Sequence, residues 1–139
     1  MAKRYDVVAL GELLIDFTGS GLSEQGNPLF EANPGGAPCN VLSMLCRLGR
    51  RTAFIGKVGR DGFGMQLEGV LKDVGIDTRG LCWDERVHTT LAVVQTLPGG
   101  DRDFSFYREP GADMMLENGD IVPGLADNCR IFHFGTLSM

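Results

Sequence analysis

Clustered positive charge is scarce in this sequence. Its 13 lysines and arginines are outnumbered by 18 aspartates and glutamates, and no basic run is longer than two residues. Proteins that bind nucleic acid through its phosphates need grouped Lys and Arg side chains to displace counterions. The charge pattern therefore argues against nucleic acid as a partner.

Long hydrophobic runs are also missing. The first apolar stretch, Val7 to Leu10, is shorter than the core of a signal peptide, and nothing approaches the length of a transmembrane span. Closely spaced cysteines are absent too, since none of the four forms a C-x-x-C pair: Cys39, Cys46, Cys82 and Cys129. We therefore expect reduced, buried thiols in a cytoplasmic protein with no membrane partner.

Metal-ligand clusters are lacking as well. The two histidines, His88 and His133, are isolated from other ligand residues, so the sequence predicts no metal site. What is present is the composition of a soluble globular domain, with 43% hydrophobic and 22% charged residues in a chain of 139.

Buried strands alternate with amphipathic helices through the first half of the chain. The expected order is a strand over 6–12, a helix from Pro38 to Gly49, a strand over 52–58, a helix from Asp61 to Gly75 and a strand over 79–82. Strands joined by helices form parallel sheets through right-handed crossovers. The sequence therefore predicts an α/β fold.

Two segments depart from this alternation. The stretch from Ser20 to Pro34 is rich in Gly, Ser, Asn and Pro, and we expect a loop with one short strand at Leu29-Phe30. Residues 89–96 and 102–107 flank a Pro-Gly-Gly-Asp turn, which predicts a β-hairpin of the kind that serves as a flap or an interface.

The last part of the sequence predicts mixed loop and short helix over 113–128, then a buried strand over 130–134. A parallel strand needs covering layers on both faces, and only five residues follow this one. We therefore expect a sheet that is incomplete within this chain.

Polar residues occur where parallel sheets bind ligands, beyond the carboxyl ends of their strands. Asp16 follows the first strand, and Gly35, Gly36 and Asn40 lie at the start of the first helix. A carboxylate, an amide and exposed backbone N–H groups suit a polyol, and glycines let the backbone approach it closely. Taken singly, each of these residues could equally be a turn residue.

Together and in order they are more specific, because the sequence resembles the ribokinase-like sugar kinases, the phosphofructokinase-B family. The matching segments are GELLIDF (11–17), PGGAPCNVLSMLCRLG (34–49), FIGKVGRDGFG (54–64), VGIDTRG (74–80), TTLAVV (89–94), FYREPGADMML (106–116) and FHFGTLSM (132–139). GELLIDF and FYREPGAD are more similar to fructokinases than to ribokinases or adenosine kinases.

The resemblance implies the N-terminal part of a ribokinase-like three-layer α/β/α sandwich with a small β lid. Residues 1–139 would be its sugar-binding portion, with lid segments at about 20–33 and 87–108, and the C-terminal nucleotide-binding portion would be absent. The residues it implies at the sugar are Asp16, Gly35, Gly36 and Asn40, with Phe106 and Arg108 from the lid. It also implies a homodimer that forms through the lid or through exposed strand edges.

The family's catalytic base belongs to a later D-T-x-G-A-G-D motif. Asp77-Thr78-Arg79-Gly80 matches its first letters but continues as Leu81-Cys82-Trp83, so we expect no catalytic residue in this chain. GKVGRDGFG (56–64) fits neither nucleotide-binding glycine motif. ATP and Mg²⁺ are therefore expected for the complete enzyme and not for this chain alone.

The leading hypothesis is an ATP-dependent, fructose-type sugar kinase represented by its acceptor-binding half and inactive alone. The alternative is a non-catalytic module that binds sugar or assembles with a second chain. A dinucleotide-dependent oxidoreductase would need a glycine fingerprint directly after the first strand, and Gly11-Glu12-Leu13-Leu14 is not one. The residues leave open which sugar is bound and whether the truncation is natural.

Overall fold

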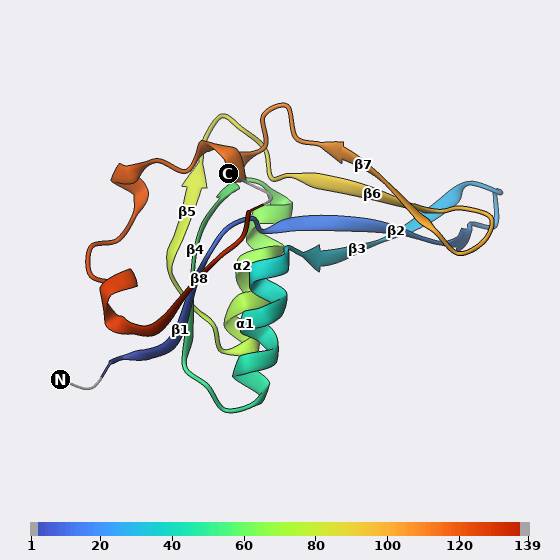
Figure 1. Cartoon of the computed structure of the whole chain (residues 1–139). Helices are drawn as coiled ribbons and strands as arrows, with labels where there is room; N and C mark the ends of the chain where they lie inside the picture. Colours follow the sequence, from blue (N-terminus) through green and yellow to red (C-terminus); the bar gives the residue numbers. More distant parts are fainter. Residues whose placement is uncertain (1–2, 137–139) are drawn as a thin grey trace.

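The computed structural model describes residues 3–136 and contains two four-stranded sheets joined at an angle (Figure 1). The body sheet has the order β5-β4-β1-β8 and the lid sheet the order β3-β2-β6-β7. The body strands are β1 (Tyr5–Leu10), β4 (Thr52–Gly59), β5 (Asp77–Asp84) and β8 (Cys129–Phe134). The lid strands are β2 (Leu14–Leu22), β3 (Pro28–Gly35), β6 (Leu91–Thr96) and β7 (Arg102–Tyr107).

The body sheet is entirely parallel and is covered on one face by helices α1 (Ala37–Arg47) and α2 (Gly62–Val74). The core between them contains Phe54 and Val58 of the sheet and the helix residues Leu42 and Leu67, all four with no exposed surface. The expected α/β fold and its parallel crossovers are therefore confirmed.

The residues at the two ends of α2 explain where this helix begins and ends. Asp61 precedes the helix and accepts a hydrogen bond from the backbone N–H of Gly64 at 2.8 Å, which is an N-cap. Gly75 ends the helix in the left-handed conformation, φ 97°, which glycine adopts without steric cost. The sequence predicted both boundaries.

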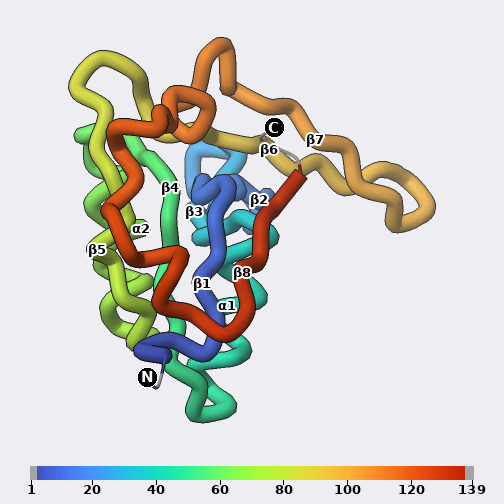
Figure 2. The backbone as a smooth tube through the Cα atoms, turned by 60° about the vertical axis from the view of Figure 1, so that its left-hand side comes forward, coloured from blue at the N-terminus to red at the C-terminus, as the bar shows by residue number. Residues whose placement is uncertain are grey.

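The opposite face of the body sheet is covered by three short 3₁₀ helices: η1 (Ala112–Met115), η2 (Asn118–Asp120) and η3 (Ala126–Asn128). Leu116, Ile121 and Leu125 from this region pack with Val8 and Ile55 of the sheet. The segment runs from β7 to β8 along the body (Figure 2). The mixture of loop and short helix that the sequence predicted here is confirmed.

Lys57 ties this layer to the sheet. Its Nζ lies 2.9 Å from Asp120 Oδ2 and 3.1 Å from the carbonyl oxygen of Met115, and its side chain is only 12% exposed. The hydrogen bond and charge of Asp120 raise the pKa of Lys57, so the ammonium is stabilised in its charged form.

The lid differs from the sequence prediction for Ser20 to Pro34. Instead of a loop with a short strand, β2 and β3 form a long antiparallel pair with a bulge between Gly19 and Gly21. The outer halves of both strands are exposed, so their sequence lacks the alternation of a half-buried strand, and pairing rather than local preference determines the structure. The hairpin of β6 and β7 is confirmed.

The first strand is also shorter than predicted, because β1 ends at Leu10 and the chain turns into the lid. Asp16 therefore lies within β2 of the lid sheet instead of in a loop after the first body strand.

Strand β8 forms one edge of the body sheet, beside β1. Its side chains Ile131, Phe132 and Phe134 are 61%, 42% and 53% exposed. The expectation of an incompletely covered last strand is confirmed for the described residues, whereas the prediction that this strand is buried is wrong, because only Cys129 of β8 is buried. No helix in residues 3–136 is both long enough and apolar enough to span a bilayer.

Candidate functional site

Four side chains lie in one row across the lid sheet. The register pairs Asp16 of β2 with Asn33 of β3 and with Ala92 of β6, and it pairs Ala92 with Phe106 of β7. Residues paired in register point to the same face of a sheet. The row therefore presents an amide, a carboxylate, a methyl group and an aromatic ring on one face, which we call the Asp16 face.

Asp16 is partly buried and accepts no hydrogen bond from any residue within 3–136. Burial raises the pKa of Asp16 above the ordinary aspartate value, because the carboxylate loses water without gaining a donor. A half-buried carboxylate without donors is costly in a folded protein. This arrangement is typical of a ligand-binding site, where the bound molecule supplies the missing donors.

The Gly35-Gly36 turn adjoins this carboxylate. A Cβ atom at Gly35 would overlap the Asp16 carboxyl group, and one at Gly36, where φ is 117°, would overlap the backbone oxygen of Glu12. Gly36 immediately precedes α1, and Asn40 lies in the first turn, where its N–H bonds to Gly36 O at 3.1 Å. The structure thus brings four of the predicted residues to one end of α1: Asp16, Gly35, Gly36 and Asn40.

The side chain of Glu12 contacts the same turn at the start of α1. Its side chain accepts a hydrogen bond from Ala37 N–H at 3.1 Å, although the residue is only 3% exposed. A carboxylate at a helix N-terminus satisfies orphan N–H groups and the helix dipole. Burial and the charge of Glu12 raise the pKa of the neighbouring Cys39 thiol, which stays protonated. Residue spacing alone did not single out Glu12.

Phe106 reaches the Asp16 face from the outer lid strand. Its ring stacks on that of Phe104, with centroids 6.0 Å apart and planes 13° apart, and both residues are 46% exposed. Ala92, which has no exposed surface, lies between Phe106 and Asp16 in this row. An aromatic ring opposite a carboxylate suits a ligand with one apolar and one hydroxyl-bearing side.

Arg108 is engaged within the protein. Its guanidinium binds Asp113 of η1 with an Nη2–Oδ2 distance of 2.6 Å, and the Asp113 side chain is fully buried. Thr90, just before β6, donates to the other Asp113 oxygen at 2.5 Å. This buried group fixes the base of the lid to the body. A sugar contact by Arg108 stays a prediction.

A second carboxylate anchors the lid from the other side. Asp61, the N-cap of α2, accepts hydrogen bonds from the backbone N–H and the hydroxyl of Thr89, both at 2.8 Å. Burial opposes the charge of Asp61, but the hydrogen bonds from Thr89 and from the backbone N–H of Gly64 outweigh it and lower the pKa of Asp61. Thr89 and Thr90 therefore hold two different carboxylates at the point where the lid leaves the body.

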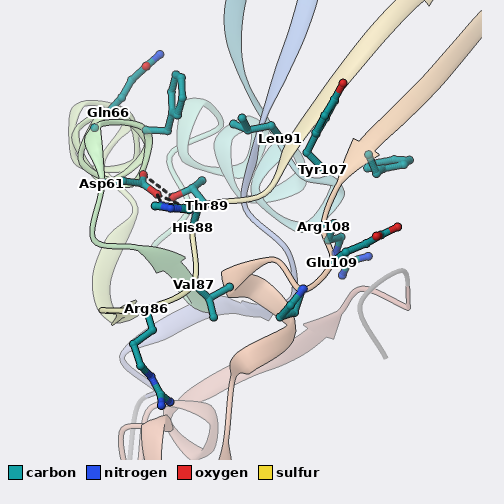
Figure 3. Close-up of a pocket in the computed structure, with 14 residues that line it drawn as sticks. Asp61, Gln66, Arg86, Val87, His88, Thr89, Leu91, Tyr107, Arg108 and Glu109 are labelled. Carbon is teal, nitrogen blue, oxygen red and sulfur yellow. Dashed lines mark hydrogen bonds and ion pairs between the residues drawn. The ribbon is translucent and has the colours of Figure 1, made fainter.

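A cavity of about 930 Å³ adjoins Asp61 and Thr89 (Figure 3). Its lining includes Phe63 and Gln66 of α2 and, from the lid, Leu91, Phe106, Tyr107 and Arg108. Leu91 and Tyr107 alternate with Ala92 and Phe106 along their strands, so the cavity lies on the reverse side of the lid from Asp16. Phe106 is shared, because it belongs to the Asp16 face and also lines the cavity.

Within residues 3–136, no group of three or more His, Cys, Asp or Glu side chains is arranged to hold a metal ion. The four cysteines are free thiols, as expected, but only Cys39 and Cys129 are buried, whereas Cys46 and Cys82 are partly exposed.

Residues 4–138 match the pfkB family of carbohydrate kinases, almost the full length of the chain. The chain belongs to this family. The family resemblance carried by the sequence motifs is thereby confirmed.

The curated relatives of this pfkB-family chain include the probable fructokinase-6, chloroplastic, of Arabidopsis thaliana, 47% identical over 135 residues, and fructokinase-2 of Solanum lycopersicum, 43% identical. Each alignment covers 96% of the chain but only 35% and 41% of these relatives. The chain therefore spans well under half of their length.

Solved structures of sugar kinases share the fold of this chain. A fructokinase from Xylella fastidiosa superposes with a TM-score of 0.86 at 33% identity, over 94% of this chain and 41% of that one. An uncharacterized sugar kinase from Pyrococcus horikoshii in complex with ATP gives 0.83 at 37% identity, over 93% and 42%. The prediction of the N-terminal part of a ribokinase-like fold is confirmed.

Proposed function

We propose that this chain is the acceptor-binding portion of an ATP-dependent sugar kinase of the fructokinase type. The observation that carries the proposal is the Asp16 carboxylate, half-buried, without a donor, and beside a glycine turn at a helix N-terminus. Sugar hydroxyls are donors that would satisfy it. Relatives with fructokinase names support fructose as the acceptor class.

In this proposal Asp16 accepts hydrogen bonds from sugar hydroxyls, and Gly35 and Gly36 let the backbone approach the sugar. Asn40 binds a further hydroxyl with its exposed amide, and Phe106 covers an apolar face of the ring. Arg108 reaches the sugar from the lid, and its ion pair with Asp113 holds the lid in place.

ATP and Mg²⁺ belong to the portion of the kinase that lies outside this chain. ATP supplies the phosphoryl group and Mg²⁺ neutralises its charge. The residues of this chain bind and orient the acceptor and, through the lid, exclude water. Residues 3–136 offer no cluster suited to the ion.

Pairing of lids into a homodimer and a cytoplasmic location complete the proposal. The exposed Phe104 and Phe106 support the former.

Titration of the ¹⁵N-labelled chain with D-fructose tests this assignment. We expect amide signals to shift along β2 near Asp16, at Gly35 to Asn40 and around Phe106. ATP with Mg²⁺, as the control, should leave these signals in place. The absence of shifts with fructose, or shifts confined to the reverse side of the lid, would contradict the proposal.

A further inference from the structure

The residue directly across from Asp16 on the lid sheet is Asn33. The two are paired in register on neighbouring antiparallel strands. Side chains paired in this way have Cβ atoms about 4.5–5.5 Å apart on the same face. Asn33 is partly buried, like Asp16. Any ligand that reaches the Asp16 carboxylate therefore also lies within reach of the Asn33 amide.

The hydrogen bonds of Asn33 determine which end of its amide faces the site. Its Nδ2 lies 2.8 Å from Thr18 Oγ1 and 3.4 Å from the carbonyl oxygen of Glu31. A backbone carbonyl can only accept, so the nitrogen end must be the one turned toward Glu31 and Thr18. Thr18 and Glu31 lie further toward the tip of the lid, so the amide oxygen is turned back from them.

No donor among residues 3–136 bonds to the Asn33 amide oxygen. The Asp16 carboxylate also lacks donors, as described above. The Asp16 face therefore carries two neighbouring acceptors, one charged and one neutral, with no donor between them. A ligand that satisfies both must bring two donors at a matching separation.

A metal cation is a poorer match than a pair of hydroxyl groups. Hard cations require about six oxygen ligands, and the row supplies oxygens only from Asn33 and Asp16 before it continues with Ala92 and Phe106. Hydroxyl groups on neighbouring carbon atoms supply two donors a short distance apart.

We infer that Asn33 is a specificity-determining residue, which binds one hydroxyl group of the acceptor while Asp16 binds the hydroxyl on the neighbouring carbon. The inference rests on the proposed function and deepens it. It assigns to the chain a preference for acceptors that carry an intact vicinal diol. Thr18 is a positioning residue, because its hydroxyl orients the Asn33 amide.

Dissociation constants of the 139-residue chain for D-fructose and its monodeoxy analogues, measured by NMR titration, test this assignment. Asn33→Ala should weaken fructose binding about fivefold, the loss typical of one neutral hydrogen bond. For the analogue that lacks the hydroxyl bound by Asn33, wild type and variant should bind equally. Thr18→Val, which keeps the amide but removes its anchor, should weaken fructose binding by a smaller factor.

Asn27→Ala is the matched control, because Asn27 lies in the exposed turn between β2 and β3. It should leave every dissociation constant unchanged. If Asn33→Ala and Thr18→Val both keep the wild-type affinity and the wild-type selectivity among analogues, the inference is overturned while the proposed function stands. If fructose and all analogues fail to bind the wild type, both are overturned. Signals of Asn33 that shift with Mg²⁺ or Ca²⁺ in the absence of sugar would instead show a cation site and overturn the diol assignment.

Discussion

Asp16 is held in an environment that opposes its charge. Burial raises its pKa in the folded chain, so the folded state binds the Asp16 proton more tightly than the unfolded state does. The free energy of unfolding therefore falls as the pH rises from the ordinary aspartate pKa through the raised one. Such a cost is expected at a binding site and not at a residue that serves stability.

Replacement of Asp16 should therefore separate binding from stability. Asp16→Asn should weaken fructose binding about tenfold to a hundredfold, since hydrogen bonds to a charged group contribute about 1.5–3 kcal/mol each. The same variant should melt at a higher temperature than wild type at pH 7, with a difference that shrinks below about pH 4. Titration with fructose and melting curves at both pH values measure the two effects. A variant that is less stable yet binds fructose normally would show that Asp16 is only structural.

Gly36 illustrates a residue whose identity is fixed by its backbone. Its φ of 117° and its contact with the Glu12 backbone leave no room for a side chain. Gly36→Ala should lower the free energy of unfolding by about 2–4 kcal/mol, because strain and overlap add. Gly69→Ala, within α2 where a Cβ would meet nothing within 4 Å, is the matched control. It should raise stability by up to about 1 kcal/mol, and chemical denaturation of both variants would measure the contrast.

At the scale of elements, the lid depends on two anchors next to each other in sequence, Thr89 on Asp61 and Thr90 on Asp113. Asp113→Ala removes the carboxylate that pairs with Arg108, whose side chain is only 17% exposed. We expect a loss of about 2–4 kcal/mol in the free energy of unfolding, reduced from the value of a fully buried pair by the remaining exposure.

Hydrogen exchange would locate this effect. Amides of β6 and β7 should exchange faster in Asp113→Ala than in wild type, while those of β1 and β4 keep their protection relative to the global stability. Glu85→Ala, which breaks an exposed pair with Arg60, is the control and should change stability by less than about 0.5 kcal/mol. Uniform acceleration across both sheets would show that Asp113 supports the body and not the lid.

The elements differ in how well the sequence predicted them. Apolar runs predicted β1, β4 and β8 because these strands are buried or paired on the body, and glycine and cap residues predicted the ends of α2. Strand β2 was missed because its outer half is exposed and glycine-containing, so only pairing with β3 and β6 defines it.

The same limit applies to the candidate site. Asp16 and the Gly35-Gly36 turn were recognisable because each lies in a segment that resembles the family, although the two meet only through the pairing of β2 with β3. Asn33 lies 17 residues from Asp16 along the chain and becomes its neighbour only through the register of β2 and β3. Asp113 likewise meets Thr90 and Arg108 only once the lid folds against the body. Register and docking are long-range properties that residue spacing does not encode.

At the scale of the whole molecule, one edge of the body sheet is open and apolar. Strand β8 has one paired side and exposes Ile131, Phe132 and Phe134. Open strand edges and exposed apolar patches promote association. We expect the chain to self-associate, with a sedimentation coefficient that rises with concentration. Phe132→Lys should reduce this association, whereas Met65→Lys on exposed α2 should not. A concentration-independent monomer would contradict the expectation.

The chain should not transfer phosphate from ATP to fructose by itself. The Asp16 face provides groups that bind an acceptor, but the sequence contains no D-T-x-G-A-G-D motif to supply a base and anion-binding amides. Loss of one preorganised donor to a developing charge costs about 10²–10³ in rate, and here the base would be missing as well. A coupled assay of ADP release with fructose and Mg²⁺ should therefore show no activity above background. Asp16→Asn identifies contaminating host kinases, because their activity would be the same in both preparations. Fructose-dependent turnover that wild type shows and Asp16→Asn lacks would prove that these 139 residues are catalytically complete.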